Sequence, residues 1–179
     1  MEILIPTRKL VFTKAQKSRW KEGHRDDCFD PYCRNLRGTS GFGEYIAGTY
    51  YESLGYAWIH HDYNLLGGNQ LGKYPKAEAI LRHYFGNERF ERGRQVYPSF
   101  SPFVRMQEPD LLIYKPDGSE IRFAECKRDD TGDKLNDSQV RGLALLHLLF
   151  ACPVEIIHIV EEGKEHRVAE GPARWTWTP

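Results

Sequence analysis

Two acidic side chains and a lysine stand beside two apolar runs of this 179-residue chain. Asp110 precedes the first run, and Glu125 and Lys127 end the second, with a Lys-Pro-Asp-Gly turn at 115–118 between them. Side chains two residues apart in a strand point to the same face of a sheet. A hairpin would bring Asp110 alongside that face. We therefore expect two carboxylates and one ammonium to converge on an otherwise hydrophobic sheet.

This combination of groups suits a divalent cation. Carboxylate oxygens are the ligands that Mg²⁺ and Mn²⁺ prefer, and the backbone carbonyl of Cys126 is expected to be a third ligand beside Asp110 and Glu125. A bound water would act as the nucleophile, while Lys127 would orient that water or neutralise charge that develops on a phosphate. A set of Asp, Glu and Lys without a serine or cysteine nucleophile favours phosphodiester hydrolysis over acyl transfer.

The composition limits the class of protein. A hydrophobic content of 40% is enough for a real core, and 25 basic residues balance 25 acidic ones, which argues against a uniformly polybasic surface but allows a local basic groove. The longest apolar stretch, 143–154, is interrupted by His147 and is shorter than the roughly 18 residues of a membrane span. No secretory signal precedes it. We expect a protein without a membrane segment, in the cytoplasm, or in the nucleus of a eukaryote.

The pattern of apolar residues predicts an α/β protein with a mixed central sheet flanked by helices. The expected parts are an irregular, basic N-terminal extension at 1–40 with a short helix near 14–21, a core at 41–165 with a helical insertion at about 67–105, and a tail at 166–179. Within them we expect helices at about 43–54, 75–84, 88–94 and 136–150, a glycine-rich loop at 67–72, a connector at 97–107, a polar loop at 128–137, and strands at 56–60, 110–114, 120–127, 153–160 and around Trp175 and Trp177. The apolar last turns of the helix at 136–150 predict that it is buried.

The motif then resembles that of a known superfamily. Pro109-Asp110 followed by Glu125-Cys126-Lys127 is similar to the PD-(D/E)XK nucleases, and the following Gly132-Asp133-Lys134-Leu135-Asn136 and Gln139 resemble the VRR-NUC branch. The likeness covers about residues 105–160 and an upstream helix. It differs at Asn136, where the family often has Ser. Members include phage and bacterial nucleases that cut branched DNA, and repair nucleases.

The resemblance implies a restriction-endonuclease-like core and a role for each matching residue. Asp110 and Glu125 would bind the metal, Lys127 would act in catalysis, and Gln139 would support the site from its helix. Glu44 matches the helical acid of the family, although Glu52, two turns later, is an alternative.

Several neighbouring residues have more than one interpretation. Lys134, Arg128 and Arg141 flank the site and are expected to contact phosphates of a nucleic acid. Glu108 is expected to lie at the rim. His24, Cys28 and Cys33 have a spacing that suggests zinc, but a fourth ligand is not evident, and reduced free thiols are the simpler interpretation.

These observations predict a Mg²⁺- or Mn²⁺-dependent nuclease that acts on DNA, including branched or flapped DNA, in repair, in a phage or in a defence system. The alternative is a catalytically silent nucleic-acid-binding or protein-docking module with the same fold. A homodimer is expected, since two cuts on two strands suit two-fold symmetry. A protein partner would bind through residues 1–40 or 67–105.

Overall fold

The computed structural model describes residues 2–66, 70–100 and 102–176. The glycine-rich loop expected at 67–72 and the tail residue Trp177 therefore lie partly or wholly outside the described residues. Within the described part of the chain, no helix combines the length and apolar character needed to cross a bilayer.

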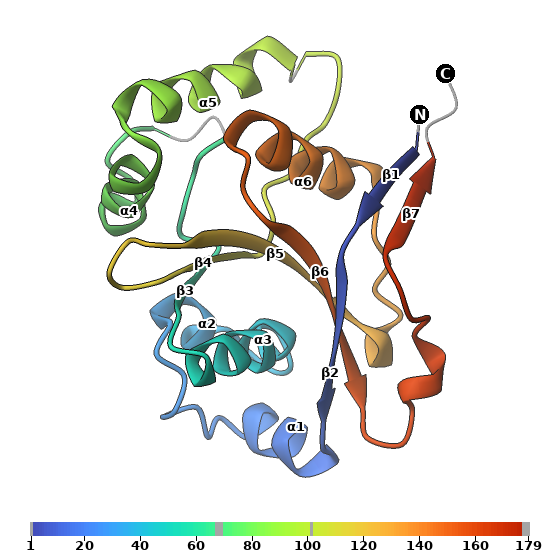
Figure 1. The fold of residues 1–179 in the computed structure, drawn as a ribbon. Coiled ribbons are helices and arrows are strands. Elements are labelled where there is room, and N and C mark those ends of the chain that lie inside the picture. The colour runs from blue at the N-terminus through green and yellow to red at the C-terminus, as the bar shows by residue number, and fades with distance from the viewer. Residues whose placement is uncertain (1, 67–69, 101, 177–179) are drawn as a thin grey trace.

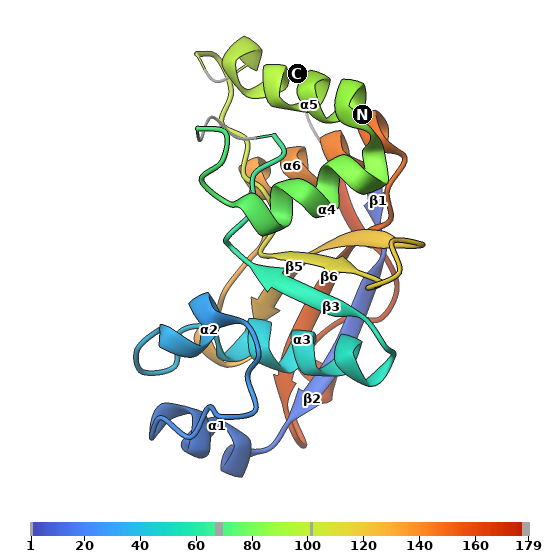
Figure 2. The same ribbon diagram turned by 90° about the vertical axis from the view of Figure 1, so that its left-hand side faces the viewer.

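The chain forms an α/β structure in which helices cover both faces of a mixed sheet (Figures 1 and 2). In chain order the elements are β1 (Glu2–Ile5), β2 (Thr7–Phe12), α1 (Lys14–Lys21), α2 (Pro31–Asn35), α3 (Phe42–Ser53), β3 (Ala57–His60), α4 (Pro75–Phe85), α5 (Asn87–Phe100), β4 (Leu111–Tyr114), β5 (Ile121–Arg128), the 3₁₀ turn η1 (Asp129–Thr131), α6 (Asp137–Phe150), β6 (Val154–Glu161), the 3₁₀ turn η2 (Glu165–Arg167) and β7 (Ala173–Thr176).

The central sheet has the strand order β2-β6-β5-β4-β3. Strands β2, β6 and β5 are parallel, whereas β4 and β3 run antiparallel to their neighbours. The β4–β5 hairpin aligns Leu111 with Ala124, so Asp110 lies at the strand end opposite Glu125. Its turn contains Gly118, whose φ of +76° is easily adopted only without a side chain.

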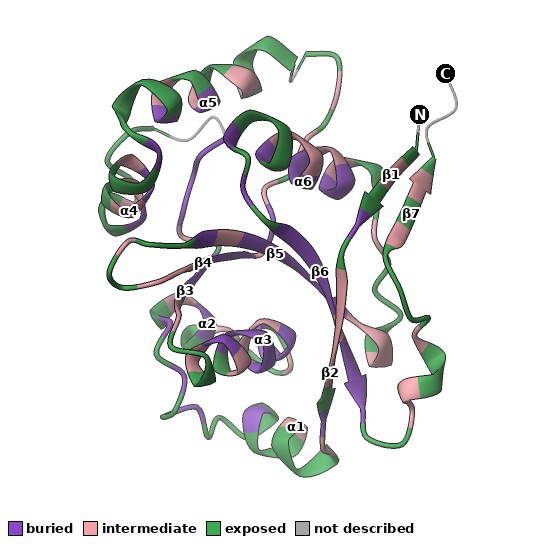
Figure 3. Ribbon diagram, in the orientation of Figure 1, coloured by how far each residue is buried: buried purple, intermediate pink, exposed green. Residues whose placement is uncertain are grey.

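Two hydrophobic clusters pack on the two faces of this sheet. Alternation along β5 sends Phe123 to the cluster under α4, α5 and α6, and Ala124 to the cluster over α3. Burial is densest in the inner strands β4, β5 and β6 (Figure 3). Helix α6 packs closely against the backbone at Gln107. Only glycine fits at position 142, since any side chain there would collide with the Gln107 carbonyl. That contact positions the segment that leads into Asp110.

Residues 2–12 correct the expectation of an irregular N-terminal extension. They form β1 and β2, and β2 is an edge strand of the central sheet, paired with β6 from Thr7↔Ile156 to Phe12↔Glu161. β1 pairs with β7 in a separate two-stranded sheet. The apolar residues of this segment stand in two short runs, 3–5 and 10–12, around Thr7, Arg8 and Lys9, so the sequence lacks the alternation typical of a half-buried strand. The short helix expected near 14–21 is confirmed as α1, with a capping box between Thr13 and Gln16.

The remaining elements follow the sequence pattern closely, with two exceptions. Helix α5 continues to Phe100, through part of the expected connector. Helix α6 begins after the predicted cap Asn136, and its last turns are buried on one side only, at Leu146 and Phe150. Leu148 and Leu149 are 76% and 43% exposed, respectively. The helical insertion expected at about 67–105 contains α4 and α5.

Candidate active site

The carboxyl groups of Asp110 and Glu125 lie side by side at the end of the β4–β5 hairpin. Asp110 accepts a hydrogen bond from the backbone N–H of Cys126, at 2.9 Å, through Oδ2. The charge of Asp110 acts directly on the Glu125 carboxyl group, which is 1% exposed, whereas Asp110 is only partly buried. The predicted convergence of the two acids is therefore present in the structure.

Lys127 completes the predicted set on the same face. Its Nζ lies 2.9 Å from Glu125 Oε1 and 3.3 Å from an oxygen of Asp133, and its side chain is only 4% exposed. Burial alone would lower the pKa of Lys127, but the charges of Glu125 and Asp133 overcome that effect and raise it. The lysine is therefore an ammonium ion with a fixed position beside the two acids.

Gln139 joins the site from the first turn of α6. Its side-chain N–H donates to Glu125 Oε1, while its own Oε1 accepts from the Asn136 backbone N–H at 3.1 Å. The Asn136 side chain in turn accepts from the Gln139 backbone N–H at 3.1 Å. This capping box begins the helix and aims the amide of Gln139 at Glu125 in one arrangement.

Glu44 approaches from the opposite layer, in the first turn of α3. Burial raises the pKa of its carboxyl group, and the nearby charge of Asp110 raises it further. The alternative acid, Glu52, instead accepts a hydrogen bond from the Trp58 indole at 2.7 Å. The structure thus brings Glu44, and not Glu52, to Asp110. Because α3 and α6 both begin here, their partial positive ends face this cluster of acids.

Lys127 offsets only part of the negative charge of the acidic cluster. Burial is the largest cause of the raised pKa of Asp110, and burial followed by the charge of Asp110 raises the pKa of Glu125 well above its usual range. Carboxyl groups held together in this way bind either protons or a cation. Two adjacent carboxylates beside a backbone segment fit a hard divalent ion. Among the described residues, no three side chains of His, Cys, Asp or Glu form a ready-made metal cage.

His60, which the sequence indicates is a satisfied surface or core histidine at a strand end, is a member of the site in the structure. It is 8% exposed, and its ring Nδ1 lies 3.0 Å from the backbone oxygen of Asp110. The same oxygen accepts the His61 backbone N–H at 3.2 Å. The signal was present in the order of elements, because the strand ending at His60 pairs with the strand that Asp110 opens. His158, opposite Lys127 in the register of β5 and β6, is a second such neighbour.

The three flanking basic residues differ in their surroundings. Arg128 is bound by Asp130, at 3.0 and 2.7 Å, and by the Thr39 carbonyl at 2.8 Å. Arg141 contacts the Arg105 carbonyl and Asp137. Lys134 is exposed. It lines a cleft of about 490 Å³ whose other basic members are Lys127, His158, Arg167 and Arg174. Contact between these residues and nucleic acid stays a prediction.

Glu108 and the suggested zinc ligands have structural surroundings. Glu108 accepts the backbone N–H groups of Leu65 and Leu66, which anchors the loop after β3. Cys28 and Cys33 are buried free thiols, and Cys33 donates to the Gly41 carbonyl at 3.1 Å. His24 is 62% exposed and lies 3.8 Å from Glu22. The three residues are not grouped around a common point in the described structure.

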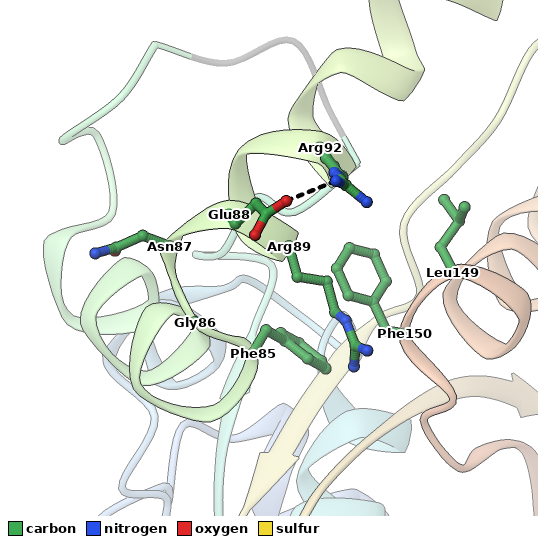
Figure 4. Close-up of a pocket in the computed structure, with 9 residues that line it drawn as sticks. Phe85, Gly86, Asn87, Glu88, Arg89, Arg92, Leu149 and Phe150 are labelled. Atoms are coloured by element: carbon green, nitrogen blue, oxygen red, sulfur yellow. Dashed lines mark hydrogen bonds and ion pairs between the residues drawn. The ribbon is translucent and has the colours of Figure 1, made fainter.

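A separate hollow of about 700 Å³ lies between α5 and the end of α6 (Figure 4). Arg89 lies there beside Phe85 and Phe150, and Arg92 is paired with Glu88 at 2.6 Å. None of the predicted site residues lines it. The hollow is therefore distinct from the acidic cluster.

Comparisons with known proteins give no further assignment. No known protein family matches this chain, and no curated protein matches it.

Proposed function

We propose that this chain is a metal-dependent nuclease with a restriction-endonuclease-like core of the PD-(D/E)XK type, and that its substrate is DNA. The observation that carries the proposal is the meeting of Asp110 with the buried Glu125 at the end of the hairpin, with Lys127 Nζ 2.9 Å from Glu125. Burying two like charges together is unfavourable unless a cation or a proton joins them.

In this proposal each residue of the site has a separate task. Asp110 and Glu125 would hold Mg²⁺ or Mn²⁺, with the Cys126 carbonyl as a further ligand. The bound ion would supply Lewis-acid activation of the phosphodiester and of the attacking water. Lys127 would orient that water and neutralise charge at phosphorus. Gln139 fixes one oxygen of Glu125, and Glu44 would hold water on the opposite side of the ion.

The test is a metal-titrated cleavage assay on linear, flapped and four-way DNA and on RNA. Wild-type protein is expected to cut at least one DNA in Mg²⁺ or Mn²⁺ and to be inactive in EDTA. Glu44→Gln should reduce cutting, whereas the matched change Glu52→Gln, two turns along the same helix, should not. Cutting that survives the double substitution of Asp110 and Lys127 by Ala in a folded protein would place the chemistry elsewhere.

The same assay separates this proposal from the alternative of a silent binding or docking module. A silent module would bind nucleic acid or a protein without metal-dependent cutting on any of these substrates. The raised pKa values of the adjacent Asp110 and Glu125 carboxyl groups favour the enzyme, because a binding module has no use for that electrostatic cost.

A further inference from the structure

A pair of aromatic rings lies directly beside the acidic cluster. Tyr32, in α2, stacks on His61, with ring centroids 4.3 Å apart and planes inclined by only 8°. Tyr32 also meets His60 edge-on at 5.2 Å. The His61 side chain is 53% exposed, so much of this stacked pair is open at the surface.

The buried carboxylate of Asp30 connects the helix that carries Tyr32 to the strand end that carries His60 and His61. Asp30 caps α2 by accepting the Cys33 backbone N–H at 2.7 Å, and its other oxygen accepts the His60 backbone N–H at 3.1 Å. Asp30 is 5% exposed. The short helix that carries Tyr32 is therefore attached to the strand end that carries His60 and His61.

The stacked pair is also attached to the acid proposed to bind metal. The backbone N–H of His61 donates to the Asp110 carbonyl at 3.2 Å, and His61 has a φ of +63°, which non-glycine residues adopt infrequently. This backbone conformation directs the exposed ring toward Tyr32 while its N–H stays on Asp110. The stacked pair is therefore attached, through the His61 backbone, to the residue whose carboxylate is proposed to hold the metal.

We propose that Tyr32 and His61 form a stacking platform for an unpaired nucleobase next to the phosphate that is cut. This inference rests on the proposed nuclease function and adds a substrate class, a polynucleotide with an unpaired or splayed base near the cleavage position. Aromatic side chains stack on bases of any sequence, but a base inside a duplex has both faces covered by its neighbours. The platform therefore selects single strands, flaps and ends.

The experiment measures binding, so it does not depend on catalysis. Fluorescence anisotropy in EDTA, and separately in Ca²⁺, would compare single-stranded DNA, single-stranded RNA, duplex DNA and an abasic DNA strand of the same length. The abasic strand keeps the phosphates and removes the bases. Wild-type protein should bind the base-containing DNA or RNA strand about tenfold more tightly than the abasic strand, which is the scale of one stacked base.

Variants test whether the platform causes this difference. Tyr32→Ala and His61→Asn should each reduce the preference for bases severalfold, while Tyr32→Phe, which keeps the ring, should retain it. Asn tolerates positive φ, so His61→Asn removes the ring with little backbone strain. Tyr84→Ala is the matched control, because Tyr84 is an exposed aromatic residue of α4 next to the β4–β5 turn, away from Asp110. Melting temperatures verify folding.

The possible results distinguish the two proposals. Loss of base preference in the Tyr32 and His61 variants, on either DNA or RNA, supports the platform. An unchanged preference in those variants, or equal wild-type affinity for abasic and base-containing strands, overturns the platform and leaves the nuclease proposal intact. Failure to bind every strand and the duplex overturns the platform, and absence of cutting in the metal-titrated assay overturns the nuclease.

Discussion

The side-chain amide of Gln139 donates a hydrogen bond to Glu125, and the same side chain closes the capping box of α6. One residue therefore connects the start of a helix to a carboxylate of the candidate site. A change at this position would alter two properties, helix capping and the orientation of Glu125, which suitable substitutions separate.

Gln139→Glu should preserve the fold but weaken metal binding. Glutamate can accept the Asn136 N–H as glutamine does, but it cannot donate to Glu125 and adds a negative charge beside it. We expect the affinity for Mg²⁺ or Mn²⁺, measured by calorimetry, to fall by about 10–100-fold. Gln139→Ala should also lose stability through the cap, by about 1 kcal/mol. Ser138→Ala is a control on the same turn, and equal metal affinity in wild type and Gln139→Glu would contradict this role.

Neutralising one of the paired acids should make the metal-free protein more stable and inactive. Asp110→Asn keeps an oxygen that can accept the Cys126 N–H while it removes a charge beside Glu125. We expect a higher melting temperature than wild type in EDTA at neutral pH, with cleavage reduced by at least about 100-fold. Scanning calorimetry and the cleavage assay measure the two effects. A lower melting temperature would show that the two acids do not repel each other in the folded state.

The stability of the metal-free protein should depend on pH in a defined direction. Burial raises the pKa values of Glu44, Asp110 and Glu125 above those of the unfolded chain, so the folded protein binds protons more tightly. Their contribution to the free energy of unfolding is complete below the unfolded carboxyl pKa, about 4, and is lost as pH rises through the raised values.

This pH dependence is measurable as a difference between proteins. The gain in melting temperature of Asp110→Asn over wild type should grow from pH 5 to pH 8. Added Mg²⁺ should stabilise wild type more at pH 8 than at pH 5, because cation binding releases protons from these groups. A gain that shrinks with rising pH would be the opposite of what the raised pKa values require.

Arg25 should be essential for the fold of the N-terminal segment. It is 6% exposed, stacks over Trp20 with its guanidinium carbon 4.3 Å from the ring centre, and donates to backbone carbonyls of Trp20, Arg34, Leu36 and Gly38. Arg25→Ala leaves buried carbonyls without a donor, so we expect a loss of about 3 kcal/mol in urea unfolding.

Two comparisons check the Arg25 prediction. Arg25→Lys should not restore stability, because an ammonium cannot reach several carbonyls at once as the planar guanidinium does. Arg37→Ala, at an exposed position of the same segment, should change stability by no more than about 0.5 kcal/mol. Equal stability of Arg25→Ala and Arg37→Ala would refute the structural role.

The sequence predicted the elements of the site well because local rules govern them. Glu125 and Lys127 share a face by strand alternation, the Pro-Asp-Gly turn fixes the register that places Asp110, and Asn136 caps its helix. Each of the four predicted residues lies close in the chain to one of these local features. They are Asp110, Glu125, Lys127 and Gln139. The metal, the DNA substrate, a homodimer and a protein partner stay predictions.

What the sequence could not predict depends on contacts between distant segments. Arg25 lies in a segment rich in basic residues, which is typical of a surface. It is nevertheless buried and donates hydrogen bonds to several backbone carbonyls. Arg128, whose contact with phosphates stays a prediction, also pairs with Asp130 and the Thr39 carbonyl, two partners that the sequence did not indicate. β2 lacks a clear apolar alternation because it is an edge strand, and its partner β6 lies at the other end of the chain. Only tertiary structure determines these partners.

The pairing of β2 with β6 has a consequence for how this chain folds. Residues 13–153 separate β2 from β6 along the chain, so the two strands cannot pair until this whole segment has been synthesised. Non-local parallel pairing of this kind slows folding and leaves the inner strand edge temporarily open to association with other chains. Lower expression temperature and chaperone coexpression should therefore increase the yield of monodisperse protein.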